Sequence, residues 1–149
     1  MEIRLVNGRT GDALATDVEF AVTRATRRRG LLGRRYLAPA SALVLAPCAA
    51  VHTAFMQFAI DLVFVNRDGR VLKVHYAVPP FRMAGAARAH AVIEMAAGTL
   101  RPETVQRGDL LHFESGAGVE TLAEALAKAS GSSPSQRSES FSGISLARR

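Results

Sequence analysis

The segment Ile60–Asn66 constrains the fold most, because it is almost wholly apolar and is bounded by turn residues. Asp61 is its one charged residue. A short apolar run of this kind is typical of a strand that is buried on both faces. Arg67-Asp68-Gly69 then predicts a hairpin turn, and residues 71–74 predict the returning strand. We therefore expect a sheet with one strand deep inside it.

Further short segments have the alternation or the apolar runs of strands: residues 2–6, 18–22, 42–46, 91–95 and 110–113. Thr23 or Thr26 would cap a short helix through residues 27–32, which Gly33 would close. We expect one more turn of helix near Pro102. Strands at hairpin spacing with short helices predict an α+β fold that is β-rich, with a curled antiparallel sheet or a small barrel.

The chain divides into three parts. Its 149 residues fit one compact domain, which we place at residues 1–115. Residues 116–129 predict a short amphipathic helix, because apolar residues from Val119 to Ala129 recur at helical spacing and Glu124 lies four residues before Lys128. Residues 130–149 are rich in serine and poor in large apolar residues, so we expect a disordered tail.

The net charge of +6 permits an anionic partner without demanding one. Six arginines lie between Arg24 and Arg35 with no acidic residue among them. They could hold the phosphates of a nucleic acid or of lipid head groups. However, an Arg-rich chain produces such runs through its composition, and Tyr36 is the one aromatic neighbour. We expect a solvated helix face and no nucleic-acid partner.

The sequence also bears on the compartment. Basic residues followed by an apolar run up to Cys48 imitate a lipoprotein signal, but Pro47 is a poor neighbour for a lipidated cysteine and strand-like segments come first. No span approaches the roughly 20 apolar residues of a membrane helix. A single cysteine excludes a disulfide-stapled secreted scaffold. We expect a cytoplasmic protein with no membrane span.

Cys48, His52 and Met56 follow one another at intervals of four, and all three are soft or borderline metal ligands. The residues around them favour extended backbone, which would separate Cys48 from Met56 by about 26 Å at about 3.3 Å per residue. We therefore expect no metal, with Cys48 and His52 as the remaining candidates for one. A Cys48 thiolate activated by His52, with Asp61 orienting the ring, is a possible nucleophile. The alternative, which we favour, is a small buried apolar cysteine.

Acidic residues form the other group of candidates. Asp61 opens the most apolar strand, where an unpartnered charge would be costly. It either floors a pocket or pins a loop, and the second role is slightly favoured. Glu94 and Asp109 lie in strand-edge or turn contexts where pinning a loop is the default role.

Five ordered segments resemble the family of domain of unknown function 192: residues 29–34, 51–65, 68–71, 92–99 and 108–109. The resemblance implies a compact, β-rich α+β domain with no settled activity. The family's most characteristic positions fall on Gly30, Thr53, Met56, Asp61, Glu94, Gly98, Gly108 and Asp109. Two positions depart from its pattern, namely Leu32 in place of methionine and Ala59 in place of an aliphatic residue or proline. Many members of the family carry an export signal, and this sequence shows none.

From these observations we predict a non-enzymatic binding module for a small molecule or a peptide, with no cofactor. The candidate pocket residues are His52, Thr53, Phe55, Met56, Asp61, Glu94 and Asp109, with Phe58 as an alternative to Phe55. The alternative is a hydrolase or transferase that uses Asp61, or the Cys48 and His52 pair, for acid–base or nucleophilic work. The oligomeric state stays open.

Overall fold

A computed structural model describes residues 2–131 and 146–147 of the chain. The elements in this part are the strands β1 (Arg4–Asn7), β2 (Ala13–Ala15), β3 (Asp17–Ala21), β4 (Ser41–Leu45), β5 (Ala50–His52), β6 (Ile60–Val65), β7 (Val71–Val78), β8 (Met83–Gly85), β9 (Ala91–Ala96), β10 (Leu111–Ser115), β11 (Gly118–Glu120) and β12 (Leu146–Ala147), and the helices α1 (Arg24–Arg29) and α2 (Leu122–Ala129). This composition confirms the predicted β-rich α+β class with short helices.

The central sheet has the strand order β3-β4-β9-β6-β7. All six residues of β6 are buried, which confirms the strand that the apolar run predicts. Side chains of β4, β6 and β9 alternate between the two faces, as the two-residue period of a strand requires. The sheet therefore separates two apolar cores.

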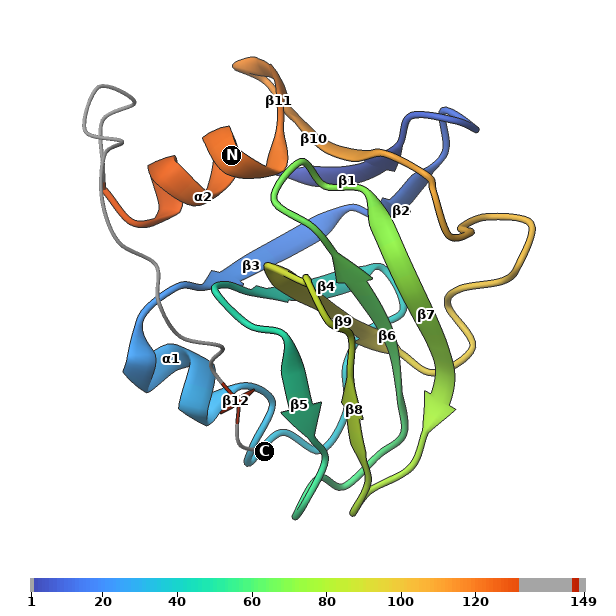
Figure 1. The fold of residues 1–149 in the computed structure, drawn as a ribbon, viewed down its shortest axis with the longest axis vertical. Helices are drawn as coiled ribbons and strands as arrows, with labels where there is room; N and C mark the ends of the chain where they lie inside the picture. Colours follow the sequence, from blue (N-terminus) through green and yellow to red (C-terminus); the bar gives the residue numbers. More distant parts are fainter. Residues whose placement is uncertain (1, 132–145, 148–149) are drawn as a thin grey trace.

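The first core lies between the central sheet and a four-stranded sheet of order β11-β10-β1-β2, together with α2. Its members include Leu5, Val44, Val63, Ile93, Met95, Leu100, Phe113 and Leu122. The second core lies on the opposite face, toward β5 and the segment that follows α1. Its members include Leu31, Leu43, Leu45, Cys48, Val51, Met56, Leu62, Phe64 and Val92. Figure 1 shows α2 at one end of the molecule, and α1, β5 and β8 at the other.

The sheets differ from the expected arrangement in two respects. No sheet in the described part of the chain closes into a barrel. In addition, β3 and β4 are parallel, whereas the other pairs of the central sheet are antiparallel. A parallel pair needs a crossover connection rather than a tight turn. The long segment that carries α1 between β3 and β4 supplies it.

Helix α1 is capped by Thr23, one of the two caps that the sequence predicts, but it ends sooner than expected. Thr23 accepts a hydrogen bond from the backbone N–H of Thr26, and the Thr26 hydroxyl accepts one from the Thr23 backbone N–H, which completes a capping box. Gly30, with φ of 47°, ends the helix, so the prediction of Gly33 at this position is wrong. Near Pro102 the chain forms a turn rather than a turn of helix.

The C-terminal elements also differ from the sequence pattern. Val119 lies in β11, because Gly118–Glu120 pair with β10, and α2 begins at Leu122 after the Thr121 cap. Leu122 packs in the first core. Of the segment predicted as a tail, residues 132–145 and 148–149 lie outside the described residues, whereas Leu146 and Ala147 form β12. Neither helix in the described part is long and apolar enough to cross a membrane.

Candidate functional site

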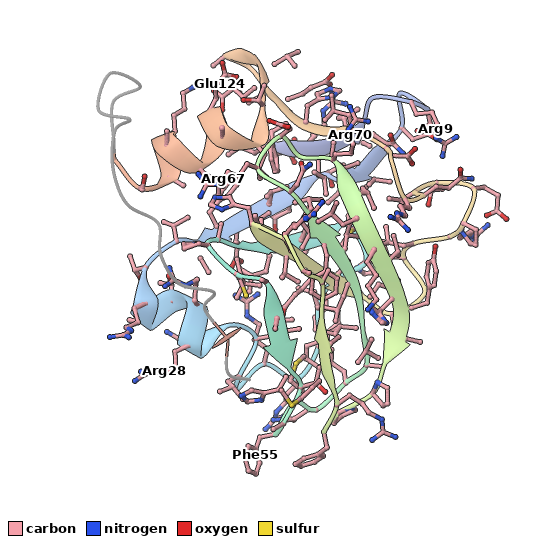
Figure 2. The ribbon with its side chains drawn as sticks, in the orientation of Figure 1. Arg9, Arg28, Phe55, Arg67, Arg70 and Glu124 are labelled. Carbon is pink, nitrogen blue, oxygen red and sulfur yellow. The ribbon has the colours of Figure 1, made fainter. Side chains whose placement is uncertain are left out.

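Three large apolar side chains are exposed together around the ends of β5 and β8. Phe55 is 75% exposed, Phe81 63% and Met83 72%. The rings of Phe55 and Phe81 meet edge to face with their centroids 5.5 Å apart. In Figure 2 Phe55 projects from the end of the molecule opposite Glu124. We call the surface formed by Phe55, Phe81 and Met83 the aromatic face.

Thr53 holds the two loops that carry this face. Its hydroxyl donates to the carbonyl of Pro79 at 2.7 Å and accepts from the backbone N–H of Arg82 at 2.9 Å. Its backbone N–H donates to the Arg82 carbonyl at 2.8 Å, and its carbonyl accepts from the N–H of Phe81 at 3.1 Å. Thr53 itself is 1% exposed. One buried threonine therefore fixes the loop after β5 against the loop before β8.

The backbone of Phe55 and of Phe81 has an unusual conformation. Phe55 has φ of 65° and Phe81 has φ of 63°, in the left-handed region that bulky residues rarely adopt. Such a residue costs on the order of 1–3 kcal/mol and persists where the surroundings impose it. The hydrogen bonds of Thr53 are surroundings of this kind. The two rings are therefore presented by a fixed framework.

The segment from Cys48 to Met56 is not extended throughout, as the sequence suggests it would be. The chain turns after β5, since the N–H of Met56 donates to the Thr53 carbonyl at 3.2 Å. Met56 packs in the second core, as Cys48 does, and the expectation of an extended segment, on which the separation of about 26 Å rested, is wrong. The Cys48 thiol donates to the Ala50 carbonyl at 3.2 Å. The described residues contain no cluster of three or more His, Cys, Asp or Glu side chains that could hold a metal.

Asp61 is fully buried and binds two backbone amides. One carboxylate oxygen accepts from the N–H of Ala77 at 2.8 Å and the other from the N–H of Leu100 at 3.0 Å. These bonds pin a bulge of β7 and the loop after β9. Partial burial of the phenol raises the pKa of Tyr76, and the charges of Asp61 and Glu103 add to this shift.

Asp61 and Glu94 lie on opposite faces of the central sheet. Asp61 is registered against Met95 of the first core, whereas Glu94 is registered against Leu62 of the second core. Glu94 is fully buried. Since Met56 is also in the second core, the described residues do not bring Asp61 and Met56 into one pocket.

Asp109 forms a separate polar cluster. It accepts hydrogen bonds from the Asn7 side chain at 2.8 Å, from Arg9 at 2.6 Å and from the backbone N–H of Gln106 at 2.7 Å. The hydrogen bond from Arg9, assisted by those from Asn7 and Gln106, holds the pKa of Asp109 below its usual value. Arg9 is far from Phe55 in Figure 2. The cluster ties the turn after β1 to the loop before β10.

The remaining candidates are distributed as follows. His52 is half-buried at the end of β5, where its register partner is Met83 of the aromatic face. Phe58 is half-buried against the second core. In the arginine run, Arg27 donates to the Val22 carbonyl at 2.9 Å and Arg34 pairs with Glu19 at 2.7 Å, while Arg28 projects outward from α1 in Figure 2. Part of the run therefore holds local structure.

Phe81 and Met83 were not among the residues singled out from the sequence, and neither were Asn7 and Arg9. The dipeptide Pro79-Pro80 gives a signal for the first two, because it ends β7 and places the large apolar residues that follow in a loop. No local pattern points to Asn7 and Arg9, since their partner Asp109 is distant in the sequence.

Comparison with solved structures shows the same fold in two bacterial proteins. A protein from Sinorhizobium meliloti, whose description provisionally names it a transcription regulator, has a TM-score of 0.64 and 25% identity, over 74% of this chain and 90% of that one. A protein of unknown function from Novosphingobium aromaticivorans has a TM-score of 0.63 and 22% identity, over 74% of this chain and 83% of that one. No curated protein matches the chain.

The family comparison confirms the resemblance seen in the sequence. The model of the DUF192 family, described as an uncharacterized ACR, matches residues 6–113. The matched part begins within β1 and ends within β10, so it includes the central sheet, the second core, most of the first core and the aromatic face. The chain therefore belongs to the DUF192 family.

Proposed function

We propose that this protein is a non-enzymatic binding module that holds an extended apolar peptide on the aromatic face. The observation that carries the proposal is the pair Phe55 and Phe81, two exposed rings in contact with each other on backbone that Thr53 holds in place. The sequence predicts a binding module for a small molecule or a peptide, and of these two ligands we propose the peptide.

The chemistry of this face suits a protein segment. Aromatic residues and methionine are enriched at the centres of protein interfaces, where they supply much of the binding energy. Rings that are fixed before binding lose little conformational entropy on binding. Small-molecule sites, in contrast, usually enclose most of their ligand. Side chains that are more than half exposed are better suited to a segment that lies across them.

We favour binding over catalysis because the groups required for the enzymatic alternative are inside the protein. Cys48 is 2% exposed, and its thiol donates to a backbone carbonyl. Both carboxylate oxygens of fully buried Asp61 accept backbone amides. A nucleophile or general base must reach the substrate within hydrogen-bond distance.

The test is selection of peptides on the immobilised full chain from a random displayed library. Fluorescence anisotropy with a selected, labelled synthetic peptide then gives its Kd for the wild type and for a Phe55→Ala, Phe81→Ala double variant. Central aromatic residues contribute about 2 kcal/mol or more when truncated, so we expect binding at least about 30-fold weaker.

Val119→Ala is the matched control, because Val119 is 67% exposed on β11, away from the aromatic face. The control should bind as the wild type does. Peptides that bind the double variant and the wild type equally well would overturn the proposal.

A further inference from the structure

Strand β5 has a second neighbour besides β8. On its other side β12 pairs with it in parallel, with Leu146 opposite Ala50 and Ala147 opposite Val51. Figure 1 shows β12 beside β5 and next to α1. Without β12, β5 would be an edge strand with a row of unpaired backbone groups, which is a template for the addition of another strand.

We propose that the outer edge of β5 is a strand-addition site for an extended peptide, and that Leu146 and Ala147 of the chain's own C-terminal segment are its resident occupants. The proposal rests on the proposed function for the identity of the competitor, which is the peptide that binds the aromatic face. The docking of the C-terminal segment stands on the strand pairing alone.

The direction of β12 connects this edge with the aromatic face. Because the pairing is parallel, an added strand runs as β5 does, from Ala50 toward His52. Thr53 follows β5 directly, and Phe55 comes two residues later. A longer peptide in the same register would therefore continue toward the aromatic face. Backbone pairing on β5 would supply affinity, and the rings would supply side-chain preference.

Covalent attachment gives the C-terminal segment an advantage over a free peptide. Residues 132–145 join the described part of the chain to β12, so docking is intramolecular. An intramolecular partner acts at an effective concentration that is set by the length of the connecting chain and does not fall on dilution. The apparent Kd of a competing peptide rises in inverse proportion to the fraction of molecules whose edge is free. The segment thus acts as a built-in competitor that weakly binding peptides do not displace.

The first test uses the full chain with Leu146→Pro and Ala147→Pro together, because proline removes the backbone donor and fixes φ. Ser138→Pro is the matched control, since it places proline in the connecting residues rather than in β12. Amide hydrogen exchange of β5 is measured by NMR. We expect at least one β5 amide to exchange about tenfold faster in the double-proline variant and to keep the wild-type rate in the control.

The second test uses a fluorescein-labelled synthetic peptide with the sequence of residues 142–149. We expect it to bind the double-proline variant about threefold or more tightly than it binds the wild type and the control, because release of the segment frees the edge. Equal β5 exchange in the wild type and the double-proline variant would overturn the proposal, and so would equal peptide affinity. Protection that rises with protein concentration would also overturn it, because a second copy would then donate the strand.

The Phe55→Ala, Phe81→Ala variant separates this proposal from the proposed function. Unchanged binding of library-selected peptides to that variant, with β5 protection lost only on proline substitution, means that the function fails and the strand-addition site stands. Weakened binding to the variant, with β5 exchange unaffected by the prolines, means that the function stands and the strand-addition site fails.

Discussion

Thr53 and Asp109 have the same structural task in two distant parts of the molecule. Each is a buried polar side chain that ties together loops from separate parts of the sequence. The loops held by Asp109 direct polar groups inward, toward the carboxylate itself. The loops held by Thr53 direct Phe55 and Phe81 outward. What distinguishes the candidate site is therefore the exposed apolar surface that a buried polar residue supports, and not the buried polar residue as such.

The largest expected effect is that of Asp109→Ala. It leaves the Asn7 amide and the Gln106 N–H without their acceptor and removes the partner of Arg9. Hydrogen bonds to charged groups are each worth about 1.5–3 kcal/mol, so the free energy of unfolding in urea should fall by about 3 kcal/mol. Arg4→Ala, at an exposed ion pair, is the control and should change it by less than about 1 kcal/mol. A loss below about 1 kcal/mol for Asp109→Ala would mean that the cluster does not hold its loops.

Thr53→Val should have the next largest effect. It removes the acceptor of the Arg82 N–H and the donor to Pro79, and should lower the free energy of unfolding by about 2 kcal/mol. Thr53→Ser, which retains the hydroxyl, is the control. If the comparison is right, Thr53→Val also weakens peptide binding to the aromatic face at a temperature where the protein is folded, whereas Asp109→Ala does not. Equal effects of the two substitutions on peptide affinity would break the comparison.

Lowering the pH should have a smaller effect on the free energy of unfolding. Burial lowers the pKa of His75 and of His90, with lesser contributions from Lys73 and Arg67 respectively. The unfolded chain therefore binds more protons than the folded chain as the pH falls below the usual histidine pKa of about 6.5. The free energy of unfolding should decline as the pH is lowered from 7 to 5. His75→Gln should reduce this decline in urea titrations at the two pH values, and an unchanged decline would contradict the assignment.

The smallest effect on stability is expected for Phe55→Ala. Its side chain is 75% exposed, and substitutions at exposed positions usually change the free energy of unfolding by no more than about 0.5 kcal/mol. The same substitution should nevertheless weaken peptide binding severalfold. A large loss of stability would show that Phe55 serves the fold, and it would remove the contrast with Asp109.

The sequence predicts well those features that depend on local pattern. The apolar run predicts β6 and its burial, since a strand covered on both faces has no polar alternation. The chemistry of a buried carboxylate predicts that Asp61 has partners, although it does not say that these are the N–H groups of Ala77 and Leu100. A loop-pinning role for Asp109 follows from its strand-edge or turn context in the sequence.

Features that depend on contacts between distant segments were not predictable in this way. The turn that returns Met56 to the second core depends on Thr53, whose other partners are 26 or more residues away in the sequence. The alternation of Val18 and Phe20 predicts a strand but not that it pairs in parallel with β4. The contact between the rings of Phe81 and Phe55 depends on the folded positions of both loops, so the sequence around Phe81 does not predict it.

Because Cys48 is buried, the rate at which its thiol reacts reports local opening of the protein. It is the one thiol in the chain and is 2% exposed in the second core, beneath the elements that carry the aromatic face. A thiol reagent can reach it only when this part of the molecule opens, so the rate of labelling measures the population of the open state. The first core contains no thiol and leaves the signal unchanged. Local opening in one half of the domain can thus be followed through the natural cysteine, without introducing another thiol.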